Sequence, residues 1–197
     1  MTRPIEFFYD FRSPYSYLAF TQLLGMDVEI ALRPMQILKV MEKVGNVPTT
    51  ITCAAKGRYA RMDLARWAQR YGLTLNPSDM RANDGDACSR AVLAAGSREE
   101  AEAITLALYR AGWSEGKPLA STGDILAAIA AAGIDPGPIA ARIDAPEVVA
   151  QLEANTDEAA ERGVFGSPSI FVGETLFFGN DRLDFVREEL ARLELAA

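Results

Sequence analysis

Hydrophobic residues at the start of the chain follow a pattern that predicts a strand, a helix and a second strand. Ile5 to Tyr9 form a short apolar and aromatic run, which is typical of a strand in a buried sheet. Ser13 and Pro14 then fit a helix start, because serine caps free amides and proline is preorganised for the first turn. We expect the helix to end at Gly25 and the alternating residues Val28 to Leu32 to form the second strand. This opening predicts a compact, parallel and right-handed βαβ unit.

The middle of the chain, residues 35–163, carries the periodicity of helices almost throughout. The segment Lys56 to Tyr71 is the most strongly periodic part and stops at a glycine. Ser97 and Ser121 are each followed three residues later by an acidic residue, so both predict a capping box that opens an alanine-rich helix. A further helix is expected to begin at Pro146. Because no repeat or low-complexity linker interrupts these residues, we expect one folded helical block.

The last part of the chain changes from helical to strand-like patterning. Ser169 to Val172 and Thr175 to Phe178 predict two short strands, and the linking dipeptide Gly173-Glu174 fits a type II′ hairpin turn. Asn180 and Asp181 are then expected to cap a final amphipathic helix. The apolar face of that helix carries Leu183, Val186, Leu190 and Leu193.

The order of these elements is that of an α/β protein with the thioredoxin fold and a large all-helical insertion. We expect residues 1–40 and 164–197 to form the thioredoxin-like unit and residues 41–163 to form the insertion. Such folds place their chemistry at the N-terminus of the first helix. A disulfide oxidoreductase has Cys-Pro-x-Cys there, whereas this chain has Ser13-Pro14-Tyr15-Ser16. The layout therefore predicts a thioredoxin fold that cannot exchange disulfides at this site.

Charge narrows the range of partners. The chain has 197 residues, 20 Lys and Arg, 27 Asp and Glu, and a net charge of −7. This acidic balance argues against nucleic acid or an anionic membrane as a partner. The longest nearly apolar stretch, Ile125 to Ile134, is too short to span a bilayer, which takes about 20 residues. Charges at Arg3, Glu6 and Asp10 make the N-terminus unlike a signal peptide, so the expected location is the cytoplasm.

Composition also removes several kinds of chemistry. The chain has no histidine, so it can form no Ser-His-Asp triad, no Cys-His pair and no His-ligated zinc site. Its two cysteines, Cys53 and Cys88, lie far apart and form neither a CxxC motif nor a zinc-type spacing. We therefore expect no metal site and interpret both cysteines as packing residues.

Ser13 has two interpretations from its residue type and position. In the first it is only the cap of a helix, where its hydroxyl accepts a hydrogen bond from a free amide. In the second it also serves a bound anion, because the helix end carries partial positive charge and unpaired amides. A thiolate supplied by a ligand would be stabilised there, with the Ser13 hydroxyl donating a hydrogen bond to it.

Two places near the C-terminus are further candidates for binding. Pro168 stands directly before the third strand, where thioredoxin folds keep a cis peptide that exposes the backbone of Ser167 to a peptide-like ligand. Alternatively, Pro168 only begins a strand. Asp181 would attract the amino group of a γ-glutamyl moiety, and the nearby helix amides would attract a carboxylate. Alternatively, Asn180 and Asp181 are only helix caps.

Several segments in combination resemble one family. They are FYDFRSPYSYLAF, RPMQIL, GNVP, KGRYARMDLARWAQRYG and GVFGSPSIFVGETLFFGNDRLDF. Together they are similar to the 2-hydroxychromene-2-carboxylate isomerases, which are relatives of the kappa-class glutathione transferases and of the oxidoreductase DsbA. The resemblance runs from Ile5 to about Leu190, although the part from Leu73 to Arg162 matches only as generic helix.

The resemblance implies a thioredoxin fold with a helical insertion that binds glutathione as a cofactor, with the sulfur held by Ser13. The site residues that it implies are the catalytic Ser13 and the glutathione-binding Asn46, Lys56, Ser167, Pro168, Asn180 and Asp181. Without the resemblance, Asn46 and Lys56 would be a loop amide and a solvated cation at a helix start. Two residues depart from the family pattern. Ser167 stands where an aliphatic residue is usual, and Thr49 stands where a second proline is frequent.

The activity implied by the resemblance is the reversible conversion of 2-hydroxychromene-2-carboxylate to trans-o-hydroxybenzylidenepyruvate in bacterial breakdown of aromatic compounds. A thiolate that adds to the conjugated carbon removes the double bond for a moment, so Ser13 is expected to be a donor and never the nucleophile. Two alternatives stay open: a kappa-like glutathione transferase or peroxidase, and a thioredoxin-like protein that binds peptides without catalysis. The implied partners are glutathione and a small aromatic substrate, and the implied assembly is a homodimer.

Overall fold

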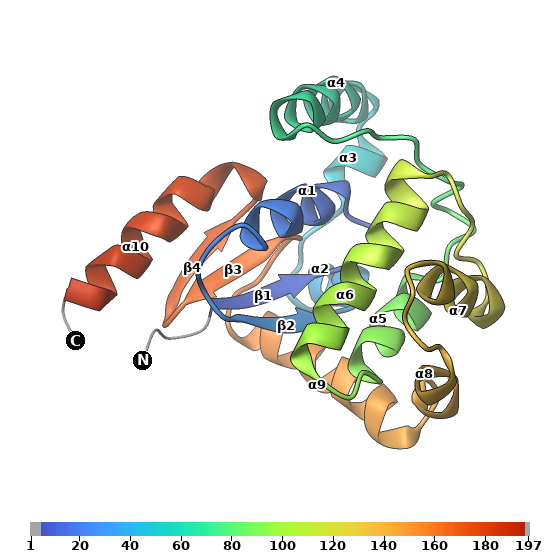
Figure 1. Ribbon diagram of the computed structural model, residues 1–197. Helices are drawn as coiled ribbons and strands as arrows, with labels where there is room; N and C mark the ends of the chain where they lie inside the picture. Colours follow the sequence, from blue (N-terminus) through green and yellow to red (C-terminus); the bar gives the residue numbers. More distant parts are fainter. Residues whose placement is uncertain (1–4, 196–197) are drawn as a thin grey trace.

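A four-stranded mixed sheet forms the centre of the protein in the computed structural model, which describes residues 5–195 (Figure 1). In sheet order the strands are β2 (Ile30–Pro34), β1 (Ile5–Tyr9), β3 (Ser169–Val172) and β4 (Thr175–Phe178). β1 and β2 are parallel, whereas β3 pairs antiparallel with both β1 and β4. A helix links β1 to β2, as parallel neighbours require.

Helices surround this sheet, and most of them lie between β2 and β3 in the chain. They are α1 (Pro14–Leu23), α2 (Ile37–Lys43), α3 (Thr49–Thr52), α4 (Ala54–Tyr71), α5 (Gly85–Leu93), α6 (Arg98–Tyr109), the π-helical turn η1 (Arg110–Ser114), α7 (Thr122–Ala131), α8 (Gly137–Arg142), α9 (Pro146–Glu161), the 3₁₀ turn η2 (Asn180–Arg182) and α10 (Leu183–Leu195). In the described part of the chain, no helix is long and apolar enough to cross a membrane.

The arrangement is a thioredoxin fold with an inserted group of helices, which confirms the predicted fold class. In Figure 1, α3 and α4 lie above α1, and α5, α7 and α8 lie to one side of the sheet. The division of the chain at residues 40 and 163 stays a prediction. Its outermost residues, 1–4 and 196–197, lie outside the described part of the chain.

The two faces of the sheet are covered by different helices, because side chains alternate along each strand. Phe7 and Tyr9 lie on the face that packs against α1, α6 and α10. Phe8 and Phe171 lie on the opposite face, against α2 and α9. Both faces of β1 are buried, so packing on two sides holds the strand in place. The loop that follows β1 therefore starts from a fixed position.

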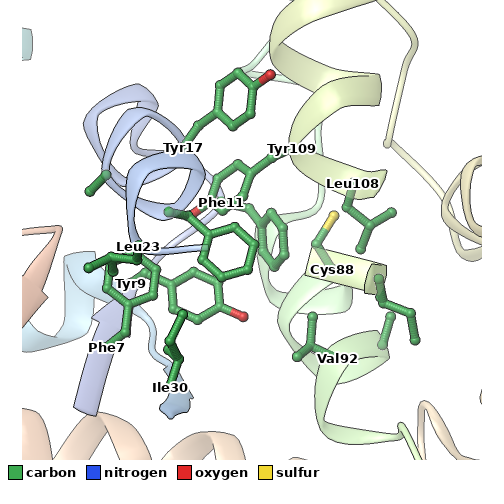
Figure 2. Packing of buried hydrophobic residues seen from close by; sticks show 14 of the residues in the cluster. Phe7, Tyr9, Phe11, Tyr17, Leu23, Ile30, Cys88, Val92, Leu108 and Tyr109 are labelled. Atoms are coloured by element: carbon green, nitrogen blue, oxygen red, sulfur yellow. The ribbon is translucent and has the colours of Figure 1, made fainter. Parts of the chain in front are cut away.

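A cluster of aromatic rings fills the space between β1, α1 and α6 (Figure 2). Tyr9 lies edge-on to Phe11 with ring centroids 5.6 Å apart, and Phe11 in turn lies 4.7 Å from Tyr109 on α6. Tyr17 on α1 stacks against the same Tyr109 at 5.5 Å. The Tyr9 hydroxyl also pairs with Thr105 at 3.0 Å. These contacts join the sheet and α1 to a helix of the insertion.

The predicted strands are confirmed, with one shift in position. β2 starts and ends two residues later than the predicted segment Val28 to Leu32. The pairing register sets these bounds, since Ile5 lies opposite the first residue of β2 and Tyr9 opposite the last. That last residue is Pro34, which an edge strand tolerates. The β3–β4 hairpin is confirmed, with Gly173 at a φ of 61° as the first residue of its two-residue turn.

The helical pattern is confirmed for α4, but other predicted helix boundaries differ. α4 ends as predicted, with Gly72 in the left-handed conformation at a φ of 67°. In contrast, α1 ends before Gly25, which does not adopt that conformation. Residues 73–84 form no helix. The Asn76 amide instead bonds to the Trp113 carbonyl at 2.8 Å, so this segment pairs largely with distant backbone.

The two predicted capping boxes form to different extents. At the start of α7, Ser121 accepts from the Asp124 amide and Asp124 accepts from the Ser121 amide, which completes the box. At the start of α6, Ser97 accepts from the Glu100 amide at 3.2 Å. The Glu100 carboxylate, however, accepts from the Gly96 amide, one residue earlier than the predicted pattern requires. The capping box at the start of α6 is therefore only half formed.

Glu6 on β1 binds two arginines, Arg33 on β2 and Arg162 at the end of α9. Its carboxylate oxygens lie 3.3 Å from Arg33 and 2.9 Å from Arg162. The Arg162 guanidinium also lies 3.9 Å from the centroid of the Phe171 ring. Burial raises the pKa of Glu6, but the two arginines outweigh this effect and hold the pKa below its ordinary value.

We expect the stability of the protein to fall in acid partly through Glu6. Its pKa is lower in the folded than in the unfolded state, so its stabilising contribution is present at neutral pH and is lost as the pH falls through the folded pKa. Glu6→Gln should lower the free energy of unfolding by about 1–2 kcal/mol at neutral pH and flatten the acid-side loss. Urea unfolding across this pH range measures both effects. An unchanged pH dependence in the variant would contradict this role.

Candidate functional site

Ser13 lies at the N-terminus of α1, directly after the loop that leaves β1. Its hydroxyl oxygen accepts a hydrogen bond from the Ser16 amide at 3.2 Å, so the predicted helix cap is confirmed. The same hydroxyl donates to the Ser167 carbonyl at 2.9 Å. The Ser167–Pro168 peptide is cis, as its place before β3 predicts. The start of α1 and the cis-proline loop are thus in direct contact.

The Ser167 side chain makes a second link between the same two segments. Its hydroxyl oxygen accepts from the Asp10 amide at 3.0 Å and lies 2.7 Å from the hydroxyl oxygen of Ser16. Ser16 is completely buried, whereas Ser167 is only partly buried. The serine that departs from the family pattern therefore connects the end of β1 with the first turn of α1.

Asp10 fixes the loop that precedes α1. Its buried carboxylate accepts hydrogen bonds from the Arg12 amide at 2.8 Å and the Ile37 amide at 2.9 Å, and it pairs with the Arg12 guanidinium at 3.0 Å. Arg12 also pairs with Asp86 on α5 at 2.8 Å. Burial raises the pKa of Asp10, and Arg12 opposes this rise. These contacts tie the loop to the starts of α2 and α5.

Two donors from the helical insertion hold the backbone of this loop. The Tyr109 hydroxyl donates to the Asp10 carbonyl at 3.2 Å, and the Trp113 indole N–H donates to the Phe11 carbonyl at 2.9 Å. Both carbonyls are buried among aromatic rings, where an unpaired polar group would be costly. The insertion therefore takes part in shaping the segment that carries Ser13.

Asn46 lies beside the cis-proline loop. Its side-chain amide donates to the Phe165 carbonyl at 2.7 Å, and its side-chain oxygen accepts from the Val47 amide at 2.8 Å. The centroid of the Phe165 ring lies 4.7 Å from that of Phe178 on β4, and both residues are partly exposed to solvent. Because Phe165 precedes Ser167 by two residues, this bond places Asn46 beside the cis-proline loop.

Lys56 lies in the first turn of α4 and lines an open surface cavity of about 440 Å³. Tyr15, from the first turn of α1, and Tyr59, from α4, line the same cavity. The Tyr15 hydroxyl donates to Asp63 at 3.1 Å, and burial together with this carboxylate raises the pKa of Tyr15. The cavity therefore adjoins the start of α1 and has aromatic walls beside one cation.

Asn180 and Asp181 do not cap the last helix with their side chains, so this prediction is wrong. They form the 3₁₀ turn η2 before α10, and Asp181 pairs with the neighbouring Arg182. The Gly179 amide donates to the Pro168 carbonyl at 3.0 Å, which brings this turn next to the cis-proline loop. The Asn180 side chain is buried, and its amide nitrogen has no hydrogen-bond partner among the described residues. It is therefore a donor without a partner beside the loop.

The predicted site residues thus surround two segments, the start of α1 and the cis-proline loop. Sequence reasoning missed the parts played by Asp10, Arg12 and Ser16, although all three lie within the motif that carries Ser13. Apart from the local pairing of Asp10 with Arg12, their partners lie far along the chain, so no local spacing indicated those contacts. Cys88 is a buried packing residue as predicted, whereas Cys53 is partly exposed at the start of α4.

The fold and this site define a thioredoxin-fold protein with serines in place of the active-site dithiol. The sequence model of the DSBA-like thioredoxin domain matches residues 4–191. A 2-hydroxychromene-2-carboxylate isomerase from Sphingobium xenophagum is 31% identical over 96% of this chain and 99% of that protein. The chain belongs to the DsbA-like thioredoxin family that includes the 2-hydroxychromene-2-carboxylate isomerases. The resemblance seen in the sequence motifs is thereby confirmed.

Two further relatives agree with this family. Glutathione S-transferase kappa 1 from Homo sapiens is 29% identical over 94% of this chain and 90% of that protein. The solved structure of a 2-hydroxychromene-2-carboxylate isomerase superimposes with a TM-score of 0.85 at 28% identity, covering 97% of this chain and 96% of the other. The relatives named here are isomerases and transferases, which are enzymes.

Proposed function

We propose that the protein is a glutathione-dependent isomerase. Its reaction interconverts 2-hydroxychromene-2-carboxylate, or a related intermediate of aromatic breakdown, and trans-o-hydroxybenzylidenepyruvate. The observation that carries this proposal is the Ser13 hydroxyl at the start of α1, in contact with the cis-proline loop and without any cysteine in the SPYS motif. The sequence identity of 31% to a named isomerase supports the choice of reaction.

The residues around Ser13 fit glutathione, a tripeptide with two carboxylates, one amino group and one thiol. The Ser167 amide and carbonyl border the cis peptide and suit pairing with a peptide backbone. The unpartnered side-chain amide of Asn180 suits a carboxylate of the γ-glutamyl end, and Asp181 suits its amino group. Lys56, in the cavity beside Tyr15, supplies a cation, and Asn46, bonded to the cis-proline loop, supplies an amide.

The chain's own residues would lower the pKa of a bound thiol. Ser13 donates a hydrogen bond, and the first turn of α1 adds partial positive charge. Glutathione, held with its sulfur beside Ser13, would supply a thiolate for reversible addition to the conjugated carbon of the substrate. The aromatic walls of the cavity, Tyr15 and Tyr59, suit the ring of that substrate. With no histidine in the chain, Ser13 acts as a donor and not as an activated nucleophile.

The test combines binding with turnover. Isothermal calorimetry with reduced glutathione measures binding, and absorbance of 2-hydroxychromene-2-carboxylate measures turnover with glutathione, with S-methylglutathione and without either. We expect turnover with reduced glutathione alone and no net loss of glutathione over many turnovers. Stoichiometric consumption of glutathione would favour the kappa-like transferase instead. Turnover that is equally fast without glutathione, or an absence of binding, would refute the cofactor role.

The compartment and the assembly belong to the same proposal. We infer the cytoplasm, where glutathione keeps thiols reduced, and both cysteines of this chain are free. A homodimer is the assembly that fits the family. Fractionation of the native cells and light scattering of the purified protein measure these two properties.

A further inference from the structure

The hydrogen of the Ser13 hydroxyl is already used within the protein. A serine hydroxyl has one hydrogen to donate and two lone pairs to accept with. Ser13 donates its hydrogen to the Ser167 carbonyl at 2.9 Å and accepts from the Ser16 amide at 3.2 Å. To donate to a bound sulfur, the Ser13 hydroxyl must therefore leave the Ser167 carbonyl.

The hydrogen of the Ser167 hydroxyl, in contrast, is free. Ser16 is completely buried, and its hydroxyl lies near the Tyr109 hydroxyl and 2.7 Å from the Ser167 oxygen, which is its one hydrogen bond of good geometry among the described residues. Because a buried hydroxyl without an acceptor costs about 1–3 kcal/mol, Ser16 donates this bond. The Asp10 amide donates to the same oxygen at 3.0 Å. Both lone pairs of the Ser167 hydroxyl are thus filled, and its hydrogen has no acceptor in the described part of the chain.

The Ser167 hydroxyl lies beside the N-terminus of α1, where the proposed function puts the sulfur of glutathione. Ser167 contributes its carbonyl to Ser13 and its hydroxyl to Ser16, so it borders both the cap and the first turn of α1. Its side chain is partly exposed, whereas that of Ser16 is completely buried. An aliphatic residue at position 167 could fill the same space but could donate no hydrogen bond.

We propose that the Ser167 hydroxyl is a second hydrogen-bond donor to the sulfur of bound glutathione, alongside Ser13. The proposal rests on the glutathione-dependent function proposed above and adds a role for the side chain of Ser167 to that of its backbone. The Asp10 and Ser16 bonds hold the Ser167 hydroxyl in one orientation, so little freedom is lost when it binds the sulfur. When Ser13 turns to the sulfur, the freed Ser167 carbonyl becomes available to an amide of the ligand.

The experiment measures the pKa of the glutathione thiol bound to the full chain, from its ultraviolet thiolate absorbance against pH. Ser167→Ala and Ser167→Val should each raise this pKa by about 0.5–1 unit, so that the ratio of thiolate to thiol at any given pH falls about 3- to 10-fold. Ser167→Thr keeps the hydroxyl and should restore the wild-type value. Ser169→Ala is the matched control, because Ser169 is a buried serine of the same segment that donates only to the Gly166 carbonyl.

A double variant separates direct action from positioning of Ser13. If Ser167 acts on the sulfur directly, Ser167→Val should raise the thiol pKa in a Ser13→Ala background as well. If it acts only by positioning Ser13, the second substitution will change nothing in that background, and the proposal is overturned. An unchanged pKa in both single variants overturns it too. Calorimetry of glutathione with the wild-type protein separates a failure of this proposal from a failure of the proposed function. If the wild-type protein does not bind glutathione, the proposed function itself is refuted.

Discussion

Replacing Ser13 with alanine should raise the pKa of bound glutathione and lower turnover by about 10²-fold, the usual effect of removing one preorganised donor from a developing or bound anion. The Ser13 hydroxyl both caps α1 and bonds to the cis-proline loop, and alanine can replace neither bond. The thiolate absorbance of the bound cofactor and the steady-state rate measure the two effects. Ser13→Ala also removes a helix cap, which costs about 1 kcal/mol of stability.

Ser97→Ala is the control for the lost cap. Ser97 caps α6 by accepting from the Glu100 amide at 3.2 Å, the same distance as the bond that Ser13 accepts. The next residue, Arg98, pairs with Glu29, which directly precedes β2. Ser13 follows the other end of β1, so Ser97 lies at the opposite end of these parallel strands. This variant should lose similar stability and keep full turnover. Equal turnover in Ser13→Ala and Ser97→Ala would remove Ser13 from the mechanism.

Replacing Asp10 with alanine should lower the free energy of unfolding by about 3–5 kcal/mol, because it leaves a charged partner and buried amides without their acceptor. The carboxylate is fully buried and accepts from Arg12 and from the Ile37 amide. Urea unfolding at neutral pH measures the change. The variant keeps the residue-10 amide that donates to Ser167, but it removes the carboxylate contacts that position this loop, so glutathione affinity should fall with stability.

Asp79→Ala provides the comparison for this variant. Asp79 accepts from the Arg81 amide at 3.1 Å, which repeats the local bond between Asp10 and Arg12 on an exposed loop. Surface substitutions of this kind change stability by about 0.5 kcal/mol or less. A loss in Asp10→Ala no larger than in Asp79→Ala would show that the buried network contributes little.

Local features of the fold could be predicted from the sequence because neighbouring residues determine them. The apolar run of β1, the glycine turn of the β3–β4 hairpin and the periodicity of α4 each follow from side chains within one element. The cap by Ser13 is likewise a bond to a residue three positions away. These features were sufficient to identify the fold class and to locate the start of α1.

Contacts between distant segments could not be predicted in this way. The bond between Ser16 and Ser167 spans 151 residues, and that between Asp10 and Ile37 spans 27. β2 is shifted because its partner sets the register, and residues 73–84 pair with distant backbone. The predicted cap by Asn180 does not form, and the Gly179 amide just before it bonds to the distant Pro168 carbonyl. In each case a partner remote in sequence decided the structure.

The two donors that the insertion directs at the loop before α1 limit how this site could be transferred to another protein. A minimal thioredoxin carrying the DFRSPYS segment would lack Tyr109 and Trp113, and the Asp10 and Phe11 carbonyls would lose their partners. The loop would then have to find other bonds, and Ser13 would move with it. Grafting the motif alone would transfer the side chains of the site but not the bonds that position them. In an engineering sense, the smallest transferable unit of this site includes α6 and the π-helical turn after it.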